Sequence, residues 1–329
     1  MSAMTRRVAC LTLLGLGAAG LRARRAVAAR PARVAWVSID PPNPDNTFLA
    51  AFRTGMRALG YTEGSGLVVE TWWGEGSPER LRKLVPEIVA SRPDVIVAAG
   101  GPAVRPFVDA NVGVPVVFTF SGDVVLGKVV QSWARPGVNR TGVSFFALEM
   151  IPKRVALLKE MLPGLKRVAF VGWPPHAGEA LEIEAAAAAA DKLGLQHRYH
   201  GAHTPAELDA AFDAIVQWKA DAVMAFAGGI TASHPDRFAA FSLRHKIPTV
   251  SAWGAFAEKG NVLTYGPVLT DSYVRLASHV DRVLKGAKPS EMPVERPTKF
   301  ELVVNMKTAK ALGLAIPSSL QARVDRVVE

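Results

Sequence analysis

Cysteine is nearly absent from this chain: among its 329 residues only Cys10 carries a thiol. We expect Cys10 to be removed with a leader, so the mature chain would contain no thiol. That absence excludes disulfide bonds, zinc sites with thiolate ligands and a cysteine nucleophile. The chain is 49% hydrophobic and 21% charged, as is typical of a globular protein with a core. Its length predicts about two domains.

A concentrated basic region is also lacking. The formal net charge is +10, but the first 28 residues contribute five arginines and no acid. Removing these five from the 39 basic residues leaves 34 against 29 acidic ones, a net charge of +5. The remaining charges are interspersed, with no basic run and no aromatic residues interleaved with basic ones. The sequence therefore predicts no nucleic acid partner.

Motifs for catalysis and cofactor binding are missing as well. No Ser/His/Asp motif, nucleophile elbow, phosphate-binding loop or catalytic carboxylate pair stands out, so no catalytic residue is predicted. A G-x-G-x-x-G pattern at residues 15–20 lacks the preceding strand that a dinucleotide site needs, so no cofactor is predicted. His197, His200 and His203 predict no metal site, because on a strand the first two face opposite sides.

The first 28 residues have the pattern of an export signal. Arg6 and Arg7 form a charged start, and the apolar stretch at residues 8–21 is too short to span a bilayer as a helix. Ala26-Val27-Ala28 fits the small-x-small pattern of a cleavage site. We expect a signal peptide over residues 1–28, cleavage after Ala28 and release of a soluble protein into the periplasm.

From Pro31 onward, strand and helix patterns alternate, and the same architecture is laid down twice. Such alternation predicts an α/β fold of two Rossmann-like lobes with parallel sheets. We expect residues 31–148 to form the first lobe and residues 149–267 the second. Part of the C-terminal tail, about residues 268–329, is expected to return to the first lobe.

The stretch at residues 115–146 organises the predicted site. An apolar run at 115–120 ends in Ser121-Gly122-Asp123, a helical pattern covers 124–133, and a second strand pattern follows at 141–146. A fully apolar strand is buried on both faces, as in a parallel sheet covered by helices. Open parallel sheets bind ligands beyond the carboxyl ends of their strands. The segment from Ser121 to Asp123 is therefore where a ligand is expected.

Polar, aromatic and glycine residues at other strand ends extend this candidate site. The polar ones either bind the ligand or cap helices. The aromatic ones either stack on the ligand or pack in the core. Paired glycines either offer backbone N–H groups to a carboxylate or form tight turns. The candidate ligand-binding residues are Asp40, Asn46, Gly100, Gly101, Phe120, Ser121, Asp123, Trp173, Gly228, Trp253 and Tyr265.

Four segments together resemble a known family. They are residues 52–61, Ser121-Gly122-Asp123, the pair of segments 135–137 and 141–144, and the long tail at 297–314. The chain resembles the extracytoplasmic substrate-binding proteins of ABC transporters, in the group associated with tryptophan or tyrosine uptake. Val124 departs from the family pattern, which usually has proline after the aspartate. Another departure is the run Gly137-Val138-Asn139-Arg140, where Gly-Gly-Asn is common.

The resemblance implies a type I periplasmic binding protein architecture that closes on a small molecule. It also implies a membrane permease of an ABC transporter as partner, and we expect a monomer. An extracytoplasmic sensor and an enzyme on the same fold remain alternatives. The ligand expected from the residues is an amino acid or a related carboxylate with an apolar body. Ser121 and the glycines would receive its carboxylate, and Asp123 or Asp40 its ammonium.

Overall fold

The computed structural model describes residues 30–145 and 147–329, and residues 31–329 form one compact unit. The expected signal peptide and Phe146 lie outside the described residues. Within the described part, none of the helices combines the length and the apolar character needed to cross a membrane.

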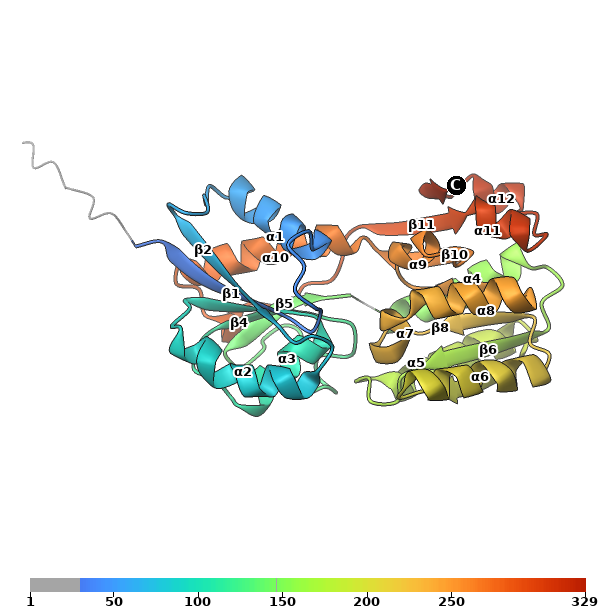
Figure 1. Cartoon of the computed structure of the whole chain (residues 1–329), viewed down its shortest axis with the longest axis horizontal. Helices are drawn as coiled ribbons and strands as arrows, with labels where there is room; N and C mark the ends of the chain where they lie inside the picture. The colour runs from blue at the N-terminus through green and yellow to red at the C-terminus, as the bar shows by residue number, and fades with distance from the viewer. Residues whose placement is uncertain (1–29, 146) are drawn as a thin grey trace, which may run out of the picture. The chain divides into compact units, whose positions relative to one another are not determined.

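The first lobe is built on a five-stranded parallel sheet in the order β2-β1-β3-β4-β5 (Figure 1). Its strands β3 and β4 are buried throughout, because helices cover both faces. Helices α1 and α10 pack on one face, and α2 and α3 pack on the other. The bounds are β1 Ala32–Ser38, α1 Thr47–Ala58, β2 Leu67–Trp73, α2 Pro78–Ala90, β3 Val95–Ala99, α3 Gly101–Asp109, β4 Val116–Phe120, β5 Arg140–Ser144 and α10 Leu269–Leu284.

The second lobe has a seven-stranded sheet in the order β12-β11-β10-β9-β8-β6-β7, in which only the β10–β11 pair is antiparallel. Its strands are β6 Arg167–Gly172, β7 Gln196–Gly201, β8 Ala222–Ala225, β9 Thr249–Ser251, β10 Leu263–Pro267, β11 Phe300–Asn305 and β12 Arg326–Val328. Its helices are α4 Ile151–Met161, α5 Glu179–Lys192, α6 Pro205–Gln217, α7 Gly229–Ser233, α8 Pro235–His245, α9 Gly254–Glu258, α11 Met306–Ala311 and α12 Ser318–Gln321. Short 3₁₀ turns occur at Leu148–Met150 and Pro289–Glu291.

The C-terminal tail divides between the two lobes, and part of it returns to the first. Helix α10 does join the first lobe: Gly55 of α1 lies so close to it that a Cβ there would lie 2.6 Å from the carbonyl oxygen of Val274. Strands β11 and β12 instead extend the sheet of the second lobe, because β11 pairs with β10 along five residues. The chain therefore passes between the lobes three times: after β5, before α10, and between Glu295 and β11.

The prediction of a helix at residues 124–133 is wrong, because this segment folds as successive turns. Gly127 interrupts the pattern, and Lys128 adopts a left-handed conformation with φ of 54°, which a helix cannot contain. Val124, Val129 and Val130 are nevertheless buried against the first lobe's core. The apolar spacing reflected burial of a folded loop rather than one face of a helix.

Candidate functional site

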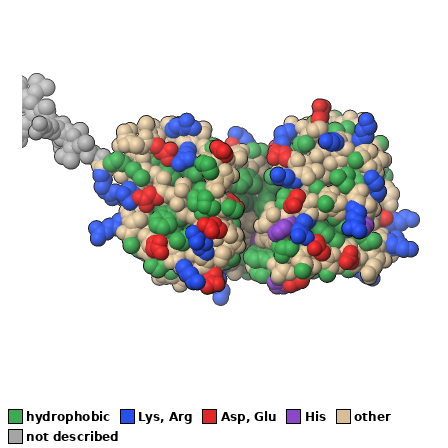
Figure 2. All heavy atoms as spheres, viewed as in Figure 1, with side chains coloured by type: hydrophobic (Ala, Val, Ile, Leu, Met, Phe, Trp, Pro, Cys, Tyr) green, Lys and Arg blue, Asp and Glu red, His purple; other side chains and the backbone are tan. Residues whose placement is uncertain are grey.

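The carboxyl ends of both sheets border one cleft with a volume of about 640 Å³. In the first lobe it is lined by residues that follow β1, β2, β3 and β4, and in the second lobe by residues that follow β6, β7 and β8. Figure 2 shows the hollow between the two bodies of the molecule. This is the edge at which open parallel sheets bind ligands, so the fold places the cleft where a ligand is expected.

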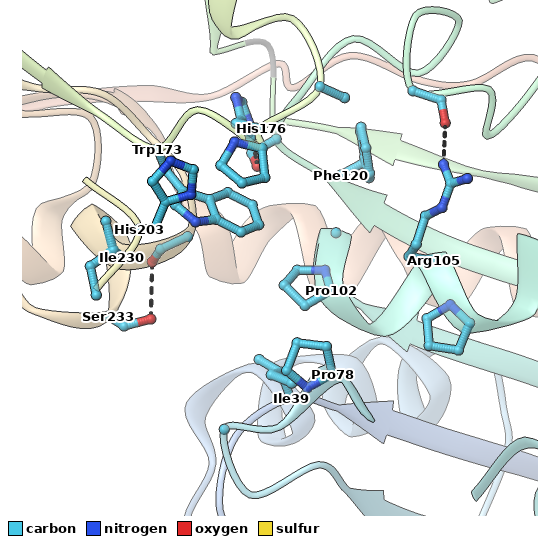
Figure 3. Close-up of a pocket in the computed structure, with 18 of the residues that line it drawn as sticks. Ile39, Pro78, Pro102, Arg105, Phe120, Trp173, His176, His203, Ile230 and Ser233 are labelled. Carbon is cyan, nitrogen blue, oxygen red and sulfur yellow. Dashed lines mark hydrogen bonds between the residues drawn. The ribbon is translucent and has the colours of Figure 1, made fainter. Parts of the chain in front are cut away.

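Apolar side chains form most of the cleft wall (Figure 3). Phe120 ends β4 in the first lobe, and Trp173 follows β6 in the second. A Cβ on Gly229 would overlap the Trp173 indole, and φ at Gly229 is 44°, so only glycine suits this position. The remaining apolar wall consists of Ile39, Pro78, Pro102, Pro106, Val129, Pro175, Ala177 and Ile230. Such a wall suits a ligand with a flat apolar body.

The ionisable residues of the cleft are all basic. Arg82 of α2 and Arg105 of α3 line the first lobe's side, and histidines line the other. Arg105 is held by Asp109, 2.9 Å from its Nε, and by the carbonyl of Gly127, which accepts from Nη1 at 3.1 Å. Among the described residues that line the cleft there is no aspartate or glutamate.

Three consecutive residues after β4 contact the second lobe directly. Ser121 Oγ lies 3.0 Å from His176 Nε2, and Asp123 donates its backbone N–H to the carbonyl of Ala177 at 2.9 Å. Between them, a Cβ on Gly122 would overlap the Ala177 carbonyl oxygen. Glycine is therefore required for the backbones to approach this closely. These contacts join the lobes next to the cleft.

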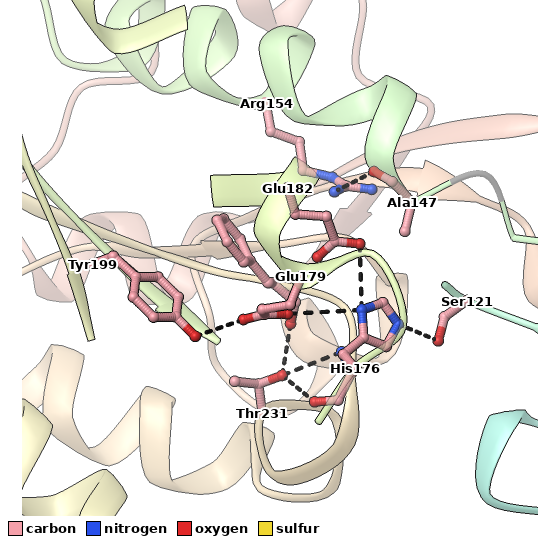
Figure 4. A network of polar contacts seen from close by, with 10 residues as sticks. Ser121, Ala147, Arg154, His176, Glu179, Glu182, Tyr199 and Thr231 are labelled. Atoms are coloured by element: carbon pink, nitrogen blue, oxygen red, sulfur yellow. Dashed lines mark hydrogen bonds and ion pairs between the residues drawn. The ribbon is translucent and has the colours of Figure 1, made fainter. Parts of the chain in front are cut away.

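Behind His176 lies a buried polar cluster (Figure 4). His176 Nδ1 is 3.5 Å from Glu182 Oε1 and 3.7 Å from Glu179 Oε2, both at the start of α5. Burial lowers the pKa of His176 to about 4 and raises that of Glu179 to about 7 and that of Glu182 to about 8. Tyr199 donates to Glu179 at 2.8 Å, while the nearby Arg154 guanidinium partly opposes the shift of Glu182. The imidazole is thus neutral at pH 7.

The same three side chains are the candidate metal ligands in the described part of the chain. His176, Glu179 and Glu182 each bring one ligand atom to within 4.8 Å of the others. Tyr199 donates a hydrogen bond to the Glu179 carboxyl group, and the fully buried Arg154 places a positive charge near that of Glu182. Both contacts oppose a cation. Of the histidines considered in the sequence, His197 pairs with Asp191 at 3.3 Å and His203 lines the cleft.

Four of the eleven predicted site residues line the cleft: Gly101, Phe120, Ser121 and Trp173. Gly228 lies beside it, where a Cβ would be 2.8 Å from the His176 ring. Gly100, with φ of 90°, caps α3 and donates its N–H to Thr119 Oγ1 at 2.8 Å. Its backbone therefore forms a tight turn, one of the two roles considered for the paired glycines.

The predicted polar residues Asp40, Asn46 and Asp123 make local hydrogen bonds instead. Asn46 caps α1, accepting from two backbone N–H groups at 2.9 and 3.0 Å. Asp123 likewise accepts from the N–H groups of the two residues after Val124, at 2.7 and 2.8 Å. Asp40 accepts from the Ser38 hydroxyl at 2.8 Å. None of the three lines the cleft.

Trp253 and Tyr265 also lie outside the cleft lining. Trp253 makes edge contacts with Phe145 and Phe256, with ring centroids 6.3 and 6.4 Å apart. Tyr265 stacks on Phe300 at 6.4 Å. Both aromatic residues therefore make packing contacts with neighbouring rings.

Sequence reasoning missed the basic residues and prolines of the cleft and the buried position of His176. The signals were present: Pro174 and Pro175 mark a loop after β6, and Pro78 opens α2. Arg82 and Arg105 each lie about one turn into a helix, where a basic residue is common on a solvated face. No local pattern distinguishes a residue that lines a cleft from one on that face.

Comparisons with known proteins all point in one direction. A family model described as ABC transporter substrate binding protein matches residues 40–328. A structure from Vibrio cholerae, described as a conserved domain protein, is 27% identical and covers 91% of this chain and all of its own, with a TM-score of 0.84. A Streptococcus pneumonia structure, an ABC domain in complex with L-Trp, is 22% identical, covers 90% and 100% of the two chains and has a TM-score of 0.80. A tyrosine-binding protein from Clostridioides difficile is 20% identical over 80% of this chain and 75% of its own length.

Proposed function

We propose that this chain, which belongs to the ABC transporter substrate-binding proteins, captures one small organic solute in the cleft and presents it to a membrane permease. The family resemblance and the two-lobed α/β fold expected from the sequence are confirmed by the family match and the structural neighbours. The family places the protein outside the cytoplasm. We further propose the periplasm as its compartment, cleavage after Ala28 as its processing, and a monomer as its working state.

The observation that carries this proposal is the cleft itself. It is lined by strand ends from both lobes, so a solute bound there contacts both at once. A ligand that touches both lobes stabilises the closed arrangement relative to an open one, because only the closed arrangement offers the full set of contacts. The three chain crossings supply the hinge for such a movement.

We propose that the solute is an amino acid or a related carboxylate with an apolar or aromatic body. Phe120 and Trp173, one from each lobe, are the aromatic side chains available to cover such a body. The L-Trp complex and the tyrosine-binding relative concern other proteins, and they support the same class of solute for this one.

We propose binding without turnover. Ser121 and His176 do meet as a nucleophile and a base would, at 3.0 Å. That chemistry requires a base whose pKa lies near neutral pH, however, and burial lowers the pKa of His176 to about 4. The carboxyl groups behind it are 3.5 and 3.7 Å from Nδ1, beyond ordinary hydrogen-bond distance.

Mass spectrometry of the protein purified from its native host tests the proposal. Denaturation should release one small molecule in near-stoichiometric amount. Returned to the stripped protein, this molecule should raise the melting temperature, since a ligand that binds only the native state stabilises it by mass action. It should also be recovered chemically unchanged after prolonged incubation. A released molecule that fails to stabilise the protein, or that is converted, would contradict the proposal.

A further inference from the structure

The proposed function leaves open which charge the solute carries, and the cleft has charge of one sign only. Arg82 and Arg105 line it, whereas no aspartate or glutamate does among the residues that the structure describes. A zwitterionic amino acid needs an acceptor for its ammonium group, because an ammonium removed from water without a partner is costly. A monoanion needs only the basic side.

Acidic residues near the cleft are each held by another group. At its first-lobe edge, Glu75 pairs with Arg80 at 3.0 Å and Glu79 pairs with Lys83 at 2.8 Å. Asp109 pairs with Arg105 at 2.9 Å. Each of these carboxylates is partly neutralised by a cation of its own, and none of them lines the cleft.

The two aspartates predicted to receive an amine are also unsuited to that role. Asp123 Oδ1 accepts from two backbone N–H groups, and Asp40 Oδ2 accepts from the Ser38 hydroxyl. Neither lines the cleft. A solute held by the residues that line the cleft would therefore not contact either carboxylate.

Glu149, which lies near Asp123 and Glu182, is also outside the cleft lining. Behind the second lobe's wall are two further carboxyl groups, those of Glu179 and Glu182. The His176 ring, which lines the cleft, lies against both of them through Nδ1. Both are buried and lie outside the cleft lining. They therefore offer no accessible carboxylate.

Arg82 is the cation best placed to receive a carboxylate. It lines the cleft from the second turn of α2 and makes no hydrogen bond or ion pair with the residues described in this structure. Arg105 has its charge partly balanced by Asp109. A guanidinium can form two parallel hydrogen bonds to a carboxylate, a geometry that lysine cannot provide.

Resting on the proposed function, we propose that the solute is an organic monoanion with an aromatic or other flat apolar body and no ammonium group. Its carboxylate pairs with Arg82, and its body lies between Phe120 and Trp173. The cleft of this chain thus selects a deaminated aromatic acid over the corresponding amino acid.

Three probes with the same body separate the charge states: 3-(4-hydroxyphenyl)propionate, L-tyrosine and tyramine, each titrated calorimetrically into the full, ligand-stripped protein. We expect the acid to bind at least tenfold more tightly than tyrosine, and tyramine to bind most weakly. Arg82→Gln should weaken binding of the acid about tenfold or more. Lys83→Gln is the matched control, because it removes the same charge from the same helix outside the cleft.

Tyrosine or tyramine binding as tightly as the acid would overturn the charge assignment and leave the proposed function intact. Equal losses from Arg82→Gln and Lys83→Gln would overturn the role of Arg82. If none of the three binds, the solute that copurifies decides: an anion without an amine supports the assignment, and an amine refutes it. If no probe binds and no solute copurifies, the proposed function fails as well.

Discussion

Ser121→Ala should favour the open arrangement of the lobes while leaving each lobe folded. The hydroxyl of Ser121 is the first lobe's partner for His176 Nε2, at 3.0 Å, and His176 is only 8% exposed. Without it the buried ring nitrogen has no partner in the closed state, whereas opening gives it access to water. Leaving a buried polar group unpaired costs about 1–3 kcal/mol. The ratio of closed to open molecules should therefore fall by about 5- to 150-fold.

The assay compares solution scattering and ligand calorimetry for four proteins: wild type, Ser121→Ala, His176→Phe and the double variant. A double-mutant cycle isolates the energy of the contact from the separate effect of each side chain on the ligand. Apparent affinity falls with the fraction of closed molecules, so both measurements should show the same coupling. Ser233→Ala is the control, since Ser233 also lines the cleft but bonds within its own lobe, to the Gly229 carbonyl at 3.0 Å.

A coupling energy near zero would refute the reasoning, because it would mean that Ser121 acts on the ligand or on its own loop alone. An equal loss in Ser233→Ala would do the same. Loss of the folded state in Ser121→Ala would also count against it, since the hydroxyl bonds across the lobes rather than within the first lobe's core.

Further predictions concern the buried cluster, the indole wall and the first lobe. Burial raises the pKa of Glu182 in the folded protein to about 8, above its ordinary value near 4.5, so stability should fall as pH rises through this interval. The pKa of the neighbouring His176 is lowered instead, so protonation of His176 reduces stability only below about pH 6.5. Thermal melts between pH 6.5 and 8.5 should therefore show the loss of stability caused by Glu182, and Glu182→Gln should make that loss smaller. Gly229→Ala should displace the Trp173 indole and weaken solute binding in calorimetry more than Gly76→Ala, whose Cβ would enter open space in the same cleft. Gly55→Val should reduce the free energy of unfolding by about 1–3 kcal/mol and so lower the melting temperature, because the added side chain overpacks the contact between α1 and α10. An unchanged melting temperature would contradict that packing.

The alternation of strands and helices was predictable because each element carries its own periodicity. Apolar runs such as that of β4 and caps such as Ser77 before α2 are local signals. The division of the tail was not predictable in this way. Strand β11 could pair with either sheet as far as its own residues show, and only the antiparallel register with β10 decides.

The candidate site was predictable at the level of strand ends but not of side-chain direction. Phe120, Ser121 and Trp173 end strands and do line the cleft. Asp40 and Asp123 occupy equivalent places, yet their carboxylates bond locally, and a short polar side chain after a strand suits either role. His176 was missed because its surroundings come from the α5 glutamates and from Ser121 of the other lobe.

The measurement that tests the central claim most directly is the distance between the lobes with and without solute. The one native cysteine, Cys10, precedes the proposed cleavage site, so spin labels can be attached to the mature protein at two introduced cysteines, replacing the exposed Lys83 on α2 and Asp213 on α6. Pulsed electron paramagnetic resonance should show a broad or long distance distribution in the stripped protein. Saturation with the solute should give a shorter, narrower one. A distribution that is identical at saturation would contradict capture by closure of the two lobes.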